Sequence, residues 1–247
     1  MLLLYALLGL LVGAFLNHCA NRLPERRPLL ARPECPYCRD GRSPSEWIAL
    51  VGFIVHRGKC PRCGAPYTLR APLLEMAALL LFVFLGRRYG FSLRFVLTAL
   101  YACIYFLLFV TDIEHRLIPD VVVYPAMLLA LAGSFLQPDV VNVKSALIGG
   151  ALGFGFFYLA ALVYPGGMGG GDVKMAGFIG LVTGFPNVIT ALFIGIFAGG
   201  IVSFFLLIAR LRALKDAIPY GPFLAIGGLT VLLFGKDLAD WILATYF

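Results

Sequence analysis

Charged residues are scarce in this 247-residue sequence. They make up 13% of the chain, whereas hydrophobic residues make up 61% and the mean hydropathy is +0.91. A soluble domain of ordinary composition carries about 25% charged residues. The composition therefore excludes such a domain and predicts a chain that lies mostly in a membrane.

Other features are missing, and each absence removes a class of function. The sequence has only three histidines, and none has an obvious nucleophile partner, which argues against a serine protease. No strand is followed by a glycine-rich nucleotide loop, so a nucleotide-type site cannot be derived from the residues. The apolar residues 1–16 lack the basic n-region and the small-residue cleavage site of a signal peptide, so they are expected to be a retained membrane helix.

Apolar runs near the ~20 residues that cross a bilayer recur along the chain. They predict an all-α polytopic membrane protein with about eight transmembrane helices and a small cytoplasmic zinc-binding segment. The organisation expected is a first transmembrane helix in residues 1–20, a cytoplasmic segment in 21–72 and a membrane-embedded core in 73–247. The predicted spans are residues 2–16, 72–86, 93–110, 121–136, 146–164, 173–182, 188–208 and 220–234.

Positive charge is concentrated in the segment between residues 21 and 72. Ten of the twenty Lys and Arg residues lie there, beside four acidic residues. Basic loops next to membrane helices stay in the cytoplasm. The region around Asp112 follows this segment after two spans, and the region around Asp172 follows after two more. Both regions are therefore expected at the same, cytoplasmic face. Nucleic-acid binding is the weaker interpretation, because no aromatic-interleaved patch or reader motif accompanies the charge.

The same segment contains two cysteine pairs, Cys35-Pro-Tyr-Cys38 and Cys60-Pro-Arg-Cys63. In a reducing compartment such pairs are metal ligands far more often than disulfides. Four thiolates complete a tetrahedral zinc shell and leave no open position, which favours a structural metal. A redox dithiol is the alternative.

Two aspartates at the edges of apolar runs are the candidate catalytic residues. Asp172 lies in Met168-Gly-Gly-Gly-Asp-Val-Lys174, and Asp112 precedes a short polar stretch. An ionisable group at membrane depth costs a few kcal/mol or more and indicates function. Two carboxylates that approach each other share one proton, so that one can accept a proton from water while the other polarises a carbonyl. Gly169 and Gly171 permit a close approach of the backbone.

Each of these residues also has a structural interpretation. Asp172 suits the N-terminus of a helix, where aspartate is a preferred cap. Asp112 can pair with Arg116 one helical turn later, and Asp120 can cap the following helix. Lys174 either faces lipid headgroups or tunes the charge of the aspartate pair.

The ordered motifs resemble those of the bacterial type IV prepilin peptidases, GxGD-type intramembrane aspartyl proteases that also act as prepilin N-methyltransferases. The resemblance covers nearly the whole chain. It rests on Phe15-Leu-Asn17…Asn21-Arg-Leu-Pro24, the two cysteine pairs, Arg70-Ala-Pro-Leu-Leu-Glu75, Asp112…Leu117-Ile-Pro-Asp120, Gly169-Gly-Gly-Asp172-Val-Lys174 and Pro219-Tyr-Gly-Pro222.

The resemblance implies a function as well as a fold. Asp112 and Asp172 would be the catalytic pair, supported by Gly169, Gly171 and Lys174. The cysteines would hold zinc, and S-adenosylmethionine would methylate the new N-terminus near Arg70 and Glu75. The substrates would be prepilins of type IV pili or pseudopilins of type II secretion, and the partners would include the lipid bilayer but no nucleic acid. The protein would be a multi-pass protein of the bacterial inner membrane, with its active site facing the cytoplasm.

One departure keeps alternatives open. Members with both activities carry an Asn-Ile-Pro…Ser-Trp stretch where this chain has Glu46-Trp-Ile-Ala-Leu-Val-Gly52, so a peptidase without methyltransferase activity is an alternative. An ion-coupled transporter with a broken helix at residues 169–184 is another, although it predicts a second, symmetric broken helix that is not visible. Glu75 either orients the incoming amine or interacts with the dipole of its own helix.

Overall fold

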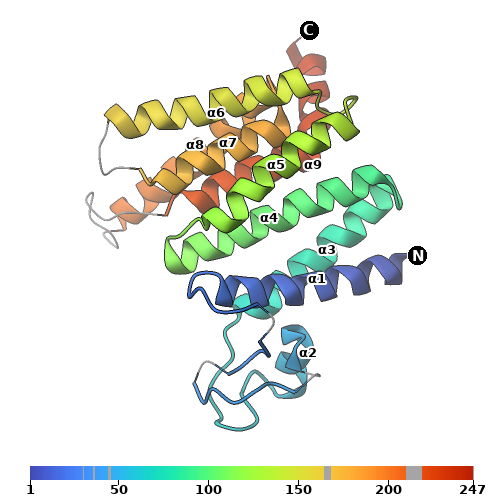
Figure 1. Ribbon diagram of the computed structural model, residues 1–247, viewed down its shortest axis with the longest axis vertical. Coiled ribbons are helices and arrows are strands. Elements are labelled where there is room, and N and C mark those ends of the chain that lie inside the picture. Colours follow the sequence, from blue (N-terminus) through green and yellow to red (C-terminus); the bar gives the residue numbers. More distant parts are fainter. Residues whose placement is uncertain (30, 36, 44–45, 164–167, 210–218, 247) are drawn as a thin grey trace. The chain divides into compact units, whose positions relative to one another are not determined.

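The structure is a computed structural model that describes residues 1–29, 31–35, 37–43, 46–163, 168–209 and 219–246, without the side chains of 239–246. This part of the chain is helical (Figure 1). Its helices are α1 (Leu2–Arg22), α2 (Ala49–Val55), α3 (Arg70–Tyr89), α4 (Leu93–His115), α5 (Asp120–Leu136), α6 (Val143–Val163), α7 (Gly170–Thr183), α8 (Asn187–Ile208) and α9 (Gly221–Tyr246).

Five of these helices are long and apolar enough to cross a membrane: α1, α4, α6, α8 and α9 up to Leu238. The helix α5 is apolar but shorter, and α3 carries both acidic and basic residues. Large apolar side chains point outward, such as Leu128 at 70% exposed and Phe193 at 65%, which suits contact with lipid. The expectation of an all-α polytopic membrane protein is confirmed, with five candidate spans among the described residues.

The chain forms two compact units, residues 1–99 and 100–247, and the boundary falls within α4. In the first unit α1 packs along α3. Glycines on α1 make this approach close, because a Cβ on Gly9 would lie 2.8 Å from the Ala78 carbonyl oxygen and one on Gly13 would lie 2.8 Å from the Glu75 Cα. The described residues of the segment between α1 and α3 are mostly irregular, and the helix α2 among them packs on α3.

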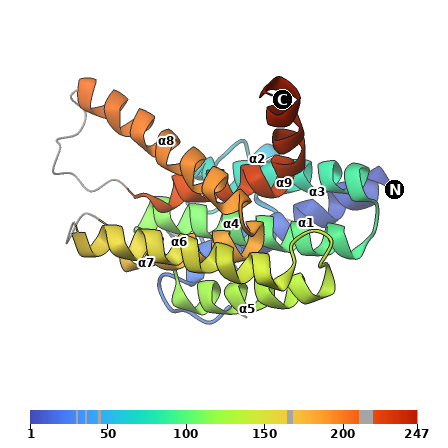
Figure 2. The same ribbon diagram turned by 90° about the horizontal axis from the view of Figure 1, so that it is seen from above.

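The short helix α7 is the centre of the second unit. It packs against α5, α6, α8 and α9, and Figure 2 shows it beside α6. Ten of its fourteen residues are buried, so its length is set by protein contacts rather than by the bilayer. Glycines again permit the closest approach: a Cβ on Gly153 of α6 would clash with the Ala176 carbonyl of α7.

Several helix ends differ from the predicted ones. The first helix continues to Arg22 instead of ending at residue 16, because the side-chain NH₂ group of buried Asn17 and the guanidinium of buried Arg22 donate hydrogen bonds within the protein. Asp112 lies inside α4, not in the loop that follows, and Gly170 and Gly171 are helical residues of α7. Tyr164, the end of the predicted fifth span, falls outside the described part.

Candidate functional site

The first candidate catalytic residue, Asp112, lies in the last turns of α4 and is 5% exposed. Its Oδ2 atom is buried and has no hydrogen-bond partner among the described residues. The pairing with Arg116 that the sequence allowed is not formed as an ion pair there, although the Arg116 amide donates to the Asp112 carbonyl at 2.9 Å. One oxygen of this buried carboxylate is therefore left without the partner that buried polar atoms normally have.

The second candidate, Asp172, lies in the first turn of α7 and is 8% exposed. The Gly169 amide donates to Asp172 Oδ2 at 3.2 Å, and the Asp172 amide donates to the Gly169 carbonyl at 3.1 Å. Asp172 thus helps to cap α7, as the structural interpretation expected, but from the third helical position instead of the N-cap. One carboxylate oxygen suffices for this bond, which leaves the other for chemistry.

The two carboxylates are near enough for the charge of Asp112 to act on Asp172. Besides α4 and α7, which carry the two aspartates, the start of α9 also lines this site. A Cβ on Gly221 of α9 would lie 2.6 Å from Asp112 Oδ2. Gly171 lies similarly close to Ile118, since a Cβ on Gly171 would be 2.9 Å from the Ile118 Cβ. We call this site, where the end of α4 meets the starts of α7 and α9, the aspartate site.

Lys174 belongs to a neighbouring contact. Its Nζ donates to Asp120 Oδ1 at 2.7 Å and lies 5.2 Å from the centre of the Tyr124 ring. Asp120 is the first residue of α5, after the N-cap Pro119. Lys174 therefore forms an ion pair with α5, which links the second turn of α7 to the first turn of α5.

The four cysteines of the first unit come together as the sequence predicted. Their sulfur atoms all lie within 4.8 Å of one another, and those of Cys35 and Cys63 are 3.9 Å apart. Each pair sits in the same tight turn, in which the amide after the second cysteine donates to the carbonyl of the first. These bonds are Arg39 to Cys35 and Gly64 to Cys60, both at 2.9 Å, and both donors have positive φ.

The cluster fits a tetrahedral metal ion. Zinc–sulfur bonds of about 2.3 Å place the sulfur atoms about 3.8 Å apart, close to the separation of Cys35 and Cys63. The backbone amides of Cys63 and Arg62 lower the pKa of the Cys60 thiol to about 7, which favours the metal-binding thiolate at this one sulfur. A disulfide joins none of these cysteines.

Glu75, one of the two candidate methyltransferase residues, is fully buried in α3. Its carboxylate accepts hydrogen bonds from the Ala49 amide at 2.8 Å and from the Leu50 amide at 2.7 Å. Asn17 of α1 donates a third bond at 3.2 Å. Glu75 therefore fastens the first turn of α2 to the α1–α3 pair. The other candidate, Arg70, donates to Asn21 Oδ1 at 2.6 Å.

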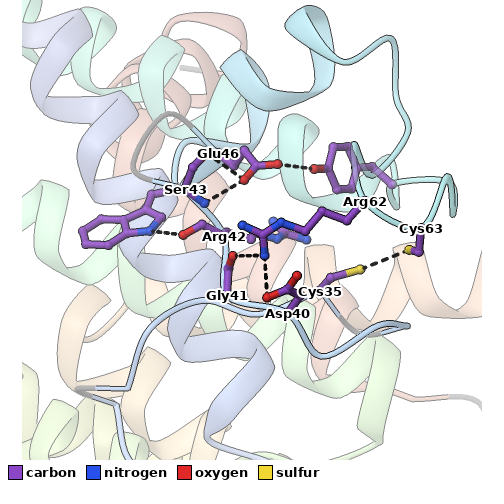
Figure 3. A network of polar contacts seen from close by, with 10 residues as sticks. Cys35, Asp40, Gly41, Arg42, Ser43, Glu46, Arg62 and Cys63 are labelled. Atoms are coloured by element: carbon purple, nitrogen blue, oxygen red, sulfur yellow. Dashed lines mark hydrogen bonds and ion pairs between the residues drawn. The ribbon is translucent and has the colours of Figure 1, made fainter.

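A polar network lies between the cysteines and α2 (Figure 3). At its centre Glu46, 5% exposed, accepts bonds of 2.7 Å from both the amide and the hydroxyl of Ser43 and one of 3.3 Å from Tyr67. Burial works to raise the pKa of Glu46, but these donors and nearby His56 outweigh it and lower the pKa. Burial raises the pKa of Tyr67 to about 12, so its hydroxyl is a donor to a charged carboxylate.

Fold and sites together define a polytopic helical membrane protein with two buried aspartates in one unit and a cluster of four cysteines that could hold a metal ion in the other. Residues 99–204 match the model of the type IV leader peptidase family, and residues 7–89 match that of the bacterial peptidase A24 N-terminal domain. The chain belongs to the type IV leader peptidase family.

Curated relatives match along nearly their whole length. A prepilin leader peptidase/N-methyltransferase of Pseudomonas aeruginosa is 31% identical over 94% of this chain and 90% of its own. Proteins of the same name from Xanthomonas campestris and Bacillus subtilis are 30% and 28% identical, over 94% and 98% of this chain and 91% and 97% of their own. No solved structure matches.

The sequence singled out most residues of these sites but not all of them. Gly221 and Ile118 were missed as walls of the aspartate site, although Pro219-Tyr-Gly-Pro222 had been noticed as a motif. The network of Glu46, Tyr67 and Arg42 was missed as well. Its members lie up to twenty-five positions apart, and no periodic pattern links them.

Proposed function

We propose that this protein cleaves the short basic leader from prepilins or pseudopilins and then methylates the new N-terminus. Asp112 and Asp172 perform the cleavage. The observation that supports this most strongly is the aspartate site itself, in which two buried carboxylates from different helices lie near each other and one of them has an unpartnered oxygen. Curated relatives of nearly the same length carry both activities in their names.

The proposed cleavage uses one ionised and one protonated aspartate. The ionised carboxylate accepts a proton from water as the water oxygen attacks the scissile carbonyl. The protonated carboxyl donates a hydrogen bond to the carbonyl oxygen, where negative charge develops. When the C–N bond breaks, the departing amine takes up a proton and becomes the new N-terminus. Gly169, Gly171 and Gly221 keep Cβ atoms out of the site, so that the substrate backbone can approach.

The cysteine cluster would hold one structural zinc ion through Cys35, Cys38, Cys60 and Cys63. With four thiolate ligands the ion completes its shell and orders the irregular segment around it, which has a small core of its own. The two turns that present the cysteines would be fixed relative to each other by the metal. The methyl donor would be S-adenosylmethionine, which supplies an electrophilic methyl group to a deprotonated amine.

In the membrane, we propose that every helix except α2 is embedded, which gives eight membrane helices. The short α7 is covered by its neighbours within the second unit. The basic segment between α1 and α3 would face the cytoplasm of a bacterial inner membrane under the positive-inside rule, and the aspartate site would open to the same side. Residues 21–72 would then be the methyltransferase segment and residues 73–247 the peptidase core.

Co-expression with a candidate prepilin, followed by mass measurement of the pilin N-terminus, tests this proposal. The expected product lacks the leader and is one methyl group heavier than the cleaved peptide. A product that is cleaved but never methylated, even with donor in excess, identifies a peptidase without the second activity. A prepilin that remains whole contradicts the proposal.

A further inference from the structure

Tyr220 precedes Gly221 at the start of α9 and is a further residue of the aspartate site. Its carbonyl accepts hydrogen bonds from the Phe223 amide at 3.1 Å and from the Leu224 amide at 3.2 Å, which joins it to the first turn of α9. The backbone of the next residue, Gly221, lies against the Asp112 carboxylate. The start of α9 therefore fixes the backbone of Tyr220 beside the first aspartate.

The ring of Tyr220 packs against three helices. Its centre lies 6.1 Å from that of Phe157 on α6 and 6.2 Å from that of Phe223 on α9. On α8, Gly199 makes room for the ring, because a Cβ there would lie 3.0 Å from Tyr220 Cε2. Aromatic pairs at such separations attract each other. These contacts restrict the orientation of the ring and hence the place of its hydroxyl.

The hydroxyl of Tyr220 lies near the second aspartate. It is near enough for the charge of Asp172 to act on it, yet it forms no hydrogen bond with the residues that the structure describes. A tyrosine hydroxyl keeps its proton at neutral pH and can donate one hydrogen bond. Tyr220 therefore places an available donor beside the carboxylates, where the proposed cleavage brings the scissile carbonyl.

We propose that Tyr220 is a third catalytic residue of the cleavage and that its hydroxyl donates a hydrogen bond to the scissile carbonyl oxygen. This inference rests on the proposed cleavage by the two aspartates. When water attacks the carbonyl carbon, an electron pair of the C=O bond moves onto the oxygen, and the protonated aspartate offers that oxygen one donor. The Tyr220 hydroxyl supplies a second donor and keeps its own proton throughout. A donor fixed in advance stabilises the transition state more than the substrate, because the negative charge develops only there.

Cleavage kinetics of a prepilin with the purified full-length protein test this role. Tyr220→Phe keeps the ring with its aromatic contacts and removes only the hydroxyl. We expect kcat to fall about 10²-fold with KM nearly unchanged, as for the loss of one donor to a developing oxyanion. The matched control is Tyr158→Phe, the same change at a tyrosine of α6 that is 48% exposed, and it should cleave as the wild type does.

Two substrate-derived peptides separate a contact with the reacting oxygen from an effect on Asp172. In the first the scissile carbonyl is replaced by a CH–OH group, which resembles the tetrahedral intermediate, and in the second it is replaced by CH₂. The wild type should bind the hydroxyl compound more tightly than the CH₂ compound. Tyr220→Phe should reduce this preference several-fold, because one hydrogen bond to the hydroxyl is lost.

The outcomes distinguish this inference from the proposed function. If the wild type cleaves and Tyr220→Phe cleaves equally fast, or keeps the full preference for the hydroxyl compound, Tyr220 does not touch the reacting oxygen and the inference alone is wrong. A retained preference with a shifted pH profile of kcat would assign the hydroxyl to Asp172 instead. If the wild type leaves the prepilin whole, the proposed function itself fails.

Discussion

Replacing Glu75 by glutamine tests what this buried carboxylate does. The structure shows it accepting the two amides at the start of α2, one on each oxygen. A carboxamide has a single oxygen, so it can keep one of these bonds while its NH₂ group faces the other amide as a second donor. The side-chain NH₂ group of Asn17 points at Glu75 and Ala71, while its Oδ1 atom has no partner among the described residues.

The expected cost is the loss of one charge-assisted hydrogen bond, about 1.5–3 kcal/mol. If Glu75 acted only on the dipole of its own helix, the cost would be less than ~1 kcal/mol. The cost falls on the docking of α2 and not on α3, whose own hydrogen bonds are unaffected. Local opening of α2 should therefore become more frequent.

Hydrogen–deuterium exchange of residues 49–55 in the purified protein measures this opening. Exchange should accelerate about tenfold or more in Glu75→Gln, following from the cost of at least ~1.4 kcal/mol. The matched control is Glu25→Gln, the same change at an exposed surface pair with Arg27. Methylation activity should fall together with the protection of the α2 amides against hydrogen exchange. If methylation is lost while α2 exchanges as in the wild type, Glu75 acts on the incoming amine and the positioning role is refuted.

Two further predictions concern the metal and the wall of the aspartate site. The purified protein should contain one zinc ion per chain by elemental analysis. Replacing any of the four cysteine ligands by serine should release the zinc and reduce methylation more than cleavage. Zinc-free protein with freely alkylated thiols would contradict this. Changing Gly221 to alanine places a Cβ 2.6 Å from the Asp112 carboxylate oxygen, so cleavage of a co-expressed prepilin should be strongly reduced. The control is Gly200→Ala, whose Cβ meets no atom within 4 Å, and this variant should cleave normally. The expected metal ligands are Cys35, Cys38, Cys60 and Cys63.

The fold class could be predicted from the sequence because apolar runs report directly on helices that face lipid. The helix ends could not, since polar residues continue a helix wherever the protein satisfies them. Asn17 is an example: it seemed to close the first span, but its side chain bonds to Ala71 and Glu75. Asp112 was similarly expected in a loop and lies in α4.

In the candidate sites, too, one part could be predicted from the sequence and another part could not. The cysteine pairs and the aspartates were predicted because their chemistry shows in their spacing and in their apolar surroundings. The partners were not predicted: Gly221 meets Asp112 and Glu75 meets Ala49 across long stretches of chain, and no local pattern encodes such contacts. Lys174 illustrates the limit, because neither of the alternatives considered for it included the ion pair with Asp120.

The central claim is that Asp112 and Asp172 cleave the prepilin leader together. Mass measurement of a co-expressed prepilin, with each aspartate replaced by asparagine, tests it most directly. Asp120→Asn is the matched control, because it removes a carboxylate from an exposed ion pair worth about 0–1 kcal/mol. We expect the wild type and Asp120→Asn to yield cleaved pilin, and Asp112→Asn and Asp172→Asn to yield only the whole precursor while remaining folded in the membrane with their zinc content unchanged. Substantial cleavage by either of these two asparagine variants would contradict the account.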